Sequence, residues 1–230
     1  MLNMRLELLL KDRHKGETCV LVANGPSLNK MNLDFLAHHT TIGMNKIFLG
    51  FEKFAFYPNY YVAVNPTVVK QSEKIIRKLN CVKFIGNRKG CLINEDSITY
   101  EINTKTPPNN FCKDISEGVR EGGTVTYASL QIAYYLGFKR VIIIGMDHSF
   151  EFEGKPNESK RMEGADTNHF ADNYFGFGQN WDNPDLEKSE KFYAIARETF
   201  ERDGREILDA TLNGKCKIFN KVNYREIFNT

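Results

Sequence analysis

The chain alternates short apolar runs with stretches that have helical periodicity. The apolar runs predict strands at residues 19–23, 40–43, 60–64, 82–85 and 141–144. Helical patterns lie at residues 30–38, 68–79, 127–136 and 184–202. Strands that alternate with helices favour a parallel sheet, because each crossover returns the chain to the same end of the sheet. We therefore expect an α/β, Rossmann-like fold with a mostly parallel sheet and helices on both faces.

Other segments carry weaker signals. Residues 97–102 and 215–219 predict two further short strands, and the leucines of residues 2–13 have the spacing of an amphipathic helix. That helix would pack either on the edge of the sheet or on a second subunit, so a homo-oligomer is among the expected partners. A long polar segment, residues 151–183, is typical of a lid or binding loop. We expect one domain over residues 1–230, with residues 148–183 as a lid or acceptor loop.

Charge and cysteine content exclude several classes of protein. Lys and Arg number 31 against 29 Asp and Glu, a formal charge of +2, which gives no argument for a nucleic-acid partner. The five scattered cysteines form no CxxC pair and predict free thiols in a reducing compartment. Charged residues interrupt the opening segment too early for a signal peptide, and no apolar run reaches the ~18 residues of a membrane span. These features predict a cytoplasmic protein.

The first predicted strand ends in the turn Asn24-Gly25-Pro26-Ser27. Gly25 permits a close approach of another group, Pro26 fixes φ, and Ser27 can cap the segment that follows. In open α/β sheets, ligands bind at this carboxyl edge. The turn matches neither a Walker loop nor a GxGxxG fingerprint, so NAD is not favoured. A plain tight turn is the alternative interpretation.

Asparagine recurs at the ends of the first four predicted strands, as Asn24, Asn45, Asn65 and Asn87. An amide side chain can both donate and accept hydrogen bonds to a base, a ribose or a phosphate. One such residue is ordinary turn chemistry. Several at one edge of a sheet predict the rim of a ligand pocket.

Three further candidates follow along the chain. Gly123 and Thr124 precede a helix whose free N–H groups would favour an anion, although a capped core helix explains them as well. Asp147 follows the most apolar strand, where it is either a functional carboxylate or the cap of a turn. His169 lies on the polar segment, where it is either a general base or a surface histidine.

Taken in order, the motifs resemble those of one bacterial family. They are VANGPSL, GMNKIF, VAVNPT, GGTVTYASLQIAYYLGFKRVIIIGMDHSF and TNHFADNYF. The family is named after the archaeal 6-hydroxymethylpterin pyrophosphokinase and includes the central domain of motility accessory factor glycosyltransferases. The same order of motifs is similar to that of the family-42 sialyltransferases, which bind and process CMP-sialic acid. The resemblance covers roughly residues 15–222 and implies a nucleotide-binding domain.

The resemblance implies which residues bind the nucleotide, all of them at strand ends or at the start of a helix. They are Asn24, Gly25, Pro26, Ser27, Asn45, Asn65, Gly123, Thr124 and Asp147. The asparagines would contact the CMP moiety, the Gly-Thr pair would lie by the ribose or phosphate, and Asp147 would border the cytidine pocket. Ala23 stands where those enzymes have glycine, a change that the turn should tolerate.

The resemblance also implies a catalytic residue. His169 matches the general base that deprotonates the acceptor hydroxyl. In the sialyltransferases, tyrosine hydroxyls steady the departing phosphate. Here His148 and Ser149 follow Asp147, and Tyr174 is the nearest lid tyrosine, so these three are binding candidates without an assigned leaving-group role.

The implied activity is that of a glycosyltransferase in surface-glycan assembly. It would transfer a sugar of the nonulosonic or sialic acid type from a CMP-activated donor to a glycan acceptor. No cofactor is obligatory, because hydrogen-bond donors and a helix N-terminus can hold the leaving CMP. One alternative is an ATP-dependent pyrophosphokinase acting on 6-hydroxymethyl-dihydropterin, with Mg²⁺ held by Asp147 and either Asp166 or Asp172. The other is a non-catalytic nucleotide-binding protein.

Overall fold

A computed structural model describes the chain except for residues 1–8, 88–92, 94–95 and 106–109. Its central feature is an eight-stranded sheet with the order β12-β11-β8-β1-β2-β3-β4-β5. Each neighbouring pair runs parallel. The strands are β1 (Thr18–Val22), β2 (Thr40–Met44), β3 (Tyr60–Ala63), β4 (Val82–Gly86), β5 (Thr99–Ile102), β8 (Arg140–Ile144), β11 (Glu206–Asp209) and β12 (Asn220–Lys221). The predicted α/β class and parallel sheet are confirmed.

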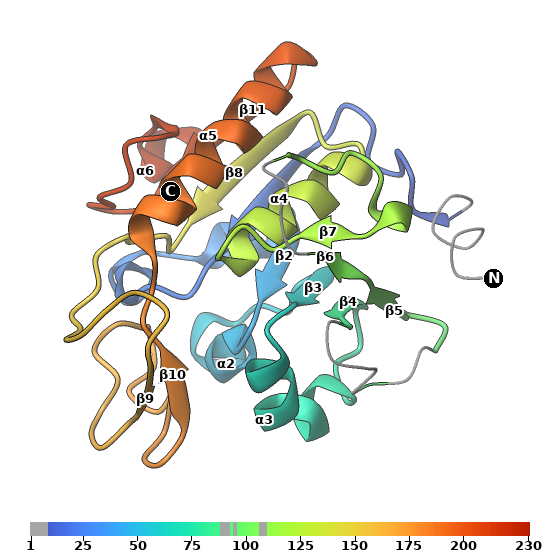
Figure 1. Ribbon diagram of the computed structural model, residues 1–230. Helices are drawn as coiled ribbons and strands as arrows, with labels where there is room; N and C mark the ends of the chain where they lie inside the picture. The colour runs from blue at the N-terminus through green and yellow to red at the C-terminus, as the bar shows by residue number, and fades with distance from the viewer. Residues whose placement is uncertain (1–8, 88–92, 94–95, 106–109) are drawn as a thin grey trace.

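Helices cover both faces of the sheet, and each face has its own apolar core (Figure 1). Alternate residues of β1 divide between the two cores: Cys19 and Leu21 face one, and Val20 and Val22 face the other. The first core holds α4 (Val125–Tyr135) and α5 (Leu186–Arg202), with the 3₁₀ turn η4 (Ile115–Glu117). The second holds η1 (Pro26–Lys30), η2 (Asp34–His38), η3 (Ile47–Gly50), α2 (Phe51–Phe54), α3 (Pro66–Ile76) and α6 (Tyr224–Phe228).

The strand order places a topological switch point between β1 and β8. From β1 the chain adds strands in one direction as far as β5, and it then returns to add β8, β11 and β12 on the other side. The crossovers on the two sides of β1 therefore diverge and leave a crevice at the carboxyl ends of β1 and β8. Ligands of open α/β sheets bind in such a crevice. The Asn24 turn and Asp147 follow these two strands.

Two sequence predictions were wrong. Residues 30–38 do not form one helix: Lys30 ends the 3₁₀ helix η1, residues 34–38 form the 3₁₀ helix η2, and residues 31–33 join the two. Residues 215–219 do not form a strand; the strands of this region are β11 and β12 instead. The apolar signal at Cys216 and Phe219 reflects their burial in the first core. Neither residue belongs to a strand of the sheet. The strand predicted at residues 97–102 is confirmed as β5.

The residues between β8 and α5 contain an antiparallel hairpin, β9 (Ser159–Arg161) and β10 (Asn180–Asp182), which lies at the lower left of Figure 1. A separate two-stranded sheet pairs β6 (Thr104–Lys105) with β7 (Val119–Arg120). Of the predicted amphipathic segment, residues 2–8 lie outside the described residues, and residues 10–16 form turns. Self-association through that segment stays a prediction.

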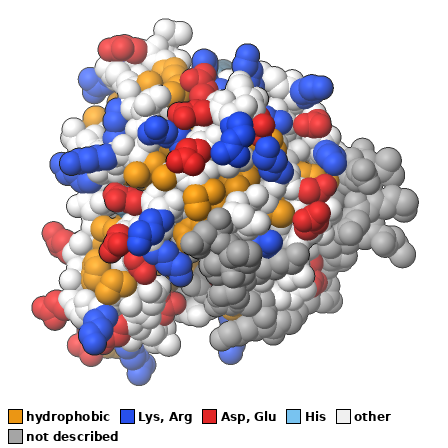
Figure 2. All heavy atoms as spheres, turned by 45° about the horizontal axis from the view of Figure 1, so that its top comes forward, with side chains coloured by type: hydrophobic (Ala, Val, Ile, Leu, Met, Phe, Trp, Pro, Cys, Tyr) orange, Lys and Arg blue, Asp and Glu red, His pale blue; other side chains and the backbone are white. Residues whose placement is uncertain are grey.

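The surface and the thiols match the composition. Figure 2 shows Lys and Arg side chains interspersed with Asp and Glu over one face, with small apolar areas between them. The four cysteines that the structure describes are free thiols, and Cys91 lies outside the described residues. None of the helices in the described part of the chain has the length and apolarity that crossing a bilayer needs.

Candidate functional site

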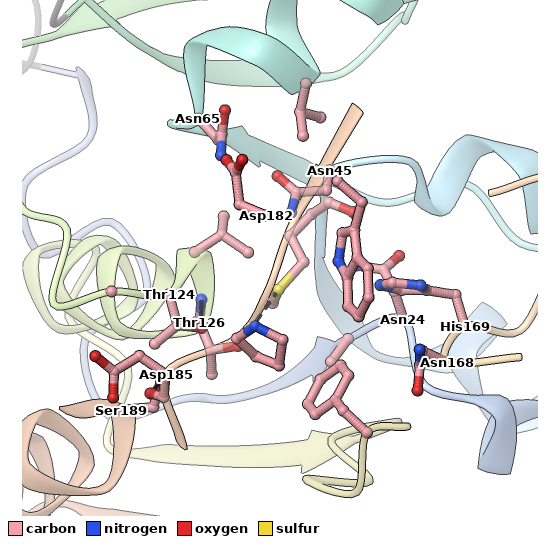
Figure 3. A pocket seen from close by; sticks show the side chains of 18 of the residues that line it. Asn24, Asn45, Asn65, Thr124, Thr126, Asn168, His169, Asp182, Asp185 and Ser189 are labelled. Carbon is pink, nitrogen blue, oxygen red and sulfur yellow. Dashed lines mark hydrogen bonds between the residues drawn. The ribbon is translucent and has the colours of Figure 1, made fainter. Parts of the chain in front are cut away.

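A pocket of about 400 Å³ opens at the carboxyl edge of the sheet, between the strand ends, the N-termini of α4 and α5, and the segment that carries the β9–β10 hairpin (Figure 3). It brings together most of the residues predicted from sequence. Those that line it are Asn24, Gly25, Asn45, Asn65, Gly123, Thr124, Asp147, His148, His169 and Tyr174. Pro26, Ser27 and Ser149 do not line it, and Ser149 is exposed.

Asp147 anchors the turn after β1. The backbone N–H of Ser27 donates to Oδ1 of Asp147 (3.1 Å), and the Ser27 hydroxyl donates to Oδ2 (2.7 Å). Burial raises the pKa of the Asp147 carboxyl, and these hydrogen bonds from Ser27 oppose that rise. Ser27 therefore acts on the site through Asp147, and Pro26 starts η1.

The asparagines play different roles at the rim. The Asn24 amide donates to the Met44 carbonyl (3.2 Å), which leaves its Oδ1 buried without a partner in the described structure. Asn45 has a left-handed backbone (φ +49°), and its Oδ1 is likewise unpartnered. Asn65 caps α3, since its side chain accepts from Thr67 N–H (2.8 Å). Asn87 is not among the residues that line the pocket.

The start of α4 faces the pocket and is also capped, so both interpretations of this sequence hold. Gly123 has φ +82°, and the Thr124 side chain accepts from the Thr126 N–H (3.2 Å). The hydroxyls of Thr124 and Tyr193 lie 3.3 Å apart. Lys188 of α5 packs its aliphatic stem beside Gly123 and lines the pocket. A helix N-terminus with an adjacent ammonium group can hold an anion.

His169 forms a pair with a carboxylate. Its Nδ1 lies 2.8 Å from Oδ2 of Asp166, and its ring stacks on Tyr174 with centroids 3.9 Å apart. Asp166 is buried and also accepts from two backbone N–H groups, those of Asn168 and Phe175. A carboxylate at Nδ1 keeps the proton there and leaves Nε2 as the basic nitrogen. From the sequence, Asp166 was predicted only as a possible metal ligand, although the spacing Asp166-x-x-His169 is consistent with the pair.

Tyr174 and His148 also line the pocket. Tyr174 is buried, and its hydroxyl accepts from the Lys46 N–H (3.3 Å). Burial raises the Tyr174 pKa above its ordinary value, so the hydroxyl stays protonated. His148 has φ +53°, and its Nε2 lies 3.1 Å from Oε1 of Glu190. Two histidines that line the pocket, His148 and His169, are thus each paired with a carboxylate.

Lys46 joins the 148–183 segment to the sheet. It is 4% exposed, and its Nζ donates to the Tyr174 carbonyl (2.8 Å) and to the side chains of Gln179 (2.7 Å) and Gln71 (3.0 Å). The same Nζ lies 4.5 Å from the centre of the Phe175 ring. Desolvation lowers its pKa from 10.5 to about 8. Such a buried lysine was not predictable from the sequence, because most lysines are exposed.

The lowered Lys46 pKa predicts a pH dependence of stability. Between about pH 8 and pH 10.5 the folded protein has lost a proton that the unfolded chain retains, so folding becomes more favourable as the pH rises through this range. Urea unfolding of the wild type and of Lys46→Met, measured at several pH values from about 7 to 10, checks this. We expect the difference in unfolding free energy to move in favour of the wild type with rising pH. A constant difference would contradict the lowered pKa.

The carboxylates do not assemble into a metal site in the part of the chain that the structure describes, where no three His, Cys, Asp or Glu side chains come together. Asp147 is occupied by Ser27, and Asp166 by His169. Asp172 is exposed. The Mg²⁺ ligand sets considered for a pyrophosphokinase are therefore not preassembled.

Comparisons with known proteins agree with this architecture. A family model described as "6-hydroxymethylpterin diphosphokinase MptE-like" matches residues 2–153. The solved structure of MAf glycosyltransferase from Magnetospirillum magneticum AMB-1 superposes with a TM-score of 0.56 and 10% sequence identity. The match covers 93% of this chain and 35% of that protein, so it shows a shared fold with one part of a larger enzyme. No curated protein matches the chain.

The family match extends over more than half of the 230 residues and includes the turn after β1, the asparagine rim, the start of α4 and Asp147. Lys188 of α5 and His169 lie beyond the matched residues. The resemblance to this family, predicted from the motifs, is confirmed. The chain belongs to the 6-hydroxymethylpterin diphosphokinase MptE-like family.

Proposed function

We propose that the protein is a glycosyltransferase that moves a sugar from a nucleotide-activated donor to an acceptor hydroxyl. The observation that carries the proposal is the His169–Asp166 pair at a pocket on the topological switch point. A hydroxyl becomes a useful nucleophile when a positioned base takes its proton. The fold shared with part of a glycosyltransferase supports the same reaction class.

The proposed reaction is a displacement at the anomeric carbon. Nε2 of His169 takes the proton of the acceptor hydroxyl as its oxygen bonds to that carbon. The bond between the anomeric carbon and the phosphate oxygen breaks, and its electron pair leaves with the nucleotide. Asp166 stabilises the imidazolium that forms, because it already bonds to Nδ1.

The start of α4 and the Lys188 ammonium would hold the departing phosphate. This arrangement needs no obligatory metal. We propose CMP as the nucleotide and a nonulosonic or sialic acid as the sugar, by the resemblance described above. A glycan of the cell surface is the corresponding acceptor, and the reaction would take place in the cytoplasm.

Residues 148–183 would act as a lid. Phe170 N–H donates to the Asn24 carbonyl (2.9 Å), and Asn29 donates to the Phe170 carbonyl (2.8 Å), so this segment rests on the turn after β1. A cover at this place would exclude water, which otherwise competes with the acceptor for the donor sugar.

Calorimetric titration tests the donor assignment. We expect CMP to bind the purified protein more tightly than UMP, AMP or ATP, and to bind equally with Mg²⁺ and with a chelator. CMP-sugars are then assayed for transfer. Binding of ATP that disappears with chelator, without binding of CMP, would refute the proposal.

The description of the family favours a second candidate function, the transfer of diphosphate from ATP to a pterin alcohol. Asp182 and Asp185 also line the pocket, and they could bind Mg²⁺ that enters with ATP. The titration above separates the two reactions by nucleotide and by metal dependence. Binding of nucleotide without turnover of any donor would instead indicate a non-catalytic nucleotide-binding protein.

A further inference from the structure

We infer that β10 and the residue that follows it, through Trp181 and Asn183, form a subsite for a hydroxyl-rich sugar ring. The inference rests on the proposed function and adds to it the part of the site that recognises a saccharide. Both residues line the pocket: Trp181 is the middle residue of β10, and Asn183 follows its last residue.

Asn183 presents an acceptor that nothing in the described structure satisfies. The residue is 2% exposed, and its amide nitrogen donates to the carbonyls of Glu153 (2.8 Å) and Lys155 (3.0 Å). These two carbonyls fix the orientation of the amide, since only its nitrogen can donate to them. Its Oδ1 is buried without a partner. A buried acceptor in this state is costly, and a ligand O–H or N–H would relieve it.

Trp181 supplies an apolar face beside that acceptor. It is half-buried, with Phe175 at 6.4 Å and Phe152 edge-on at 6.5 Å between ring centroids. These neighbours hold the indole in place while part of it stays open to the pocket. The face of an aromatic ring carries partial negative charge, so it attracts the C–H groups on one side of a sugar ring.

The chemistry of this wall favours a polyol over a nucleobase. The Asn183 side chain offers its carbonyl oxygen, because its amide nitrogen already donates to two carbonyls, and Asp182 offers an exposed carboxylate. Both groups accept hydrogen bonds. A sugar ring carries several O–H donors, whereas a base offers few.

The subsite adjoins the proposed base. Phe175 contacts both the His169 ring (5.5 Å) and the Trp181 ring (6.4 Å), so the three rings form one continuous wall. A sugar on Trp181 would therefore lie on the wall that carries the basic nitrogen. The sugar could belong to the donor or to the acceptor, and the experiment below separates these sources.

The test compares Trp181→Ala with Phe177→Ala by calorimetry on the full chain. Phe177 lies on the same segment, is 81% exposed and does not line the pocket, so its variant is the matched control. The probes are CMP, CMP-N-acetylneuraminic acid and lactose. We expect Trp181→Ala to bind CMP normally and to lose about tenfold in affinity for one sugar-bearing probe. Weaker binding of CMP-N-acetylneuraminic acid would assign the subsite to the donor sugar, and weaker binding of lactose would assign it to the acceptor.

A second measurement uses the wild type and needs no variant to fold. Trp181 is the only tryptophan in the chain, so acrylamide quenching of tryptophan emission reports on this side chain alone. A sugar-bearing probe should protect it, and CMP should not. Equal protection by CMP, or equal loss of CMP affinity in Trp181→Ala, would place a nucleobase on the indole and overturn the inference.

Failure of this inference is distinguishable from failure of the proposed function. If the wild type binds CMP but Trp181→Ala binds every probe normally, the subsite is wrong and the donor assignment stands. If the wild type binds ATP with Mg²⁺ in place of CMP, the proposed function fails. Protection of Trp181 from quenching by lactose would then still support a saccharide subsite. If lactose gave no protection, the subsite would be overturned as well.

Discussion

Replacing His169 with alanine is expected to lower kcat for sugar transfer by about 10²–10⁴-fold, the contribution typical of a positioned general base. Affinity for CMP should stay within about twofold, because the imidazole acts on the acceptor and not on the nucleotide. Steady-state transfer assays and calorimetry on the same preparation measure the two effects. His38→Ala is the matched control, since His38 is exposed on η2 and does not line the pocket.

Asp166→Asn separates positioning from catalysis. The amide keeps the size of the carboxylate but removes the charge that stabilises the imidazolium, so kcat should fall less than in His169→Ala. The acidic limb of the pH–rate profile should also change, which loss of structure alone would not cause. Full activity of His169→Ala would refute the assignment of His169 as the base. His148, which lines the same pocket and pairs with Glu190, would then be the next candidate base.

The sheet was predictable because its strands are buried on both faces. Residues 141–144 are continuously apolar for that reason, and they form the centre of β8. β11 was missed because its four residues, EILD, carry a charge at each end. Glu206 pairs with Arg140 and Asp209 with Lys221, so tertiary partners compensate for a weak local signal. Such partners are far apart in the sequence and leave no local pattern.

The asparagine pattern was a partial guide to the site. Neighbouring strands lie about 4.8 Å apart, so β4 lies about 14 Å from β1 across the sheet. That separation explains why Asn87 does not line a pocket centred on β1 and β8, although it follows the end of a strand as Asn24 does. Strand order decides which of several similar turns meet, and strand order was not contained in the motif spacing.

The pairings that organise the site were the least predictable. Ser27 and Asp147 are 120 residues apart, and neither was predicted to bond to the other. Together they brace the turn against the end of β8. Lys188 and Gly123 are likewise distant in the sequence, and the aliphatic stem of Lys188 packs beside Gly123 at the pocket. Packing between elements determined these contacts.

Gly25→Ala is expected to be among the most damaging single substitutions in the chain. A Cβ at this position would lie 1.8 Å from Oδ2 of Asp147 and 2.6 Å from the Gly145 carbonyl oxygen. The backbone at Gly25 (φ −73°, ψ 158°) suits any residue, so the damage would come from packing alone. We expect a loss of about 3 kcal/mol in unfolding free energy, from overpacking and from the broken Ser27–Asp147 hydrogen bonds. That corresponds to a fall in Tm of roughly 6–12 °C, measured by calorimetry.

Gly164→Ala is the control, because a Cβ there meets nothing within 4 Å and the backbone does not have positive φ. A thermodynamic cycle with Asp147→Ala identifies the cause of the damage. Removing the carboxylate removes the closest clash but not that with the Gly145 carbonyl, so the double variant should be more stable than the sum of the two single losses predicts. CMP affinity should fall in Gly25→Ala even well below its Tm, since the turn that holds Asn24 must move. Strict additivity, or an unchanged Tm, would mean that Asp147 does not brace this turn.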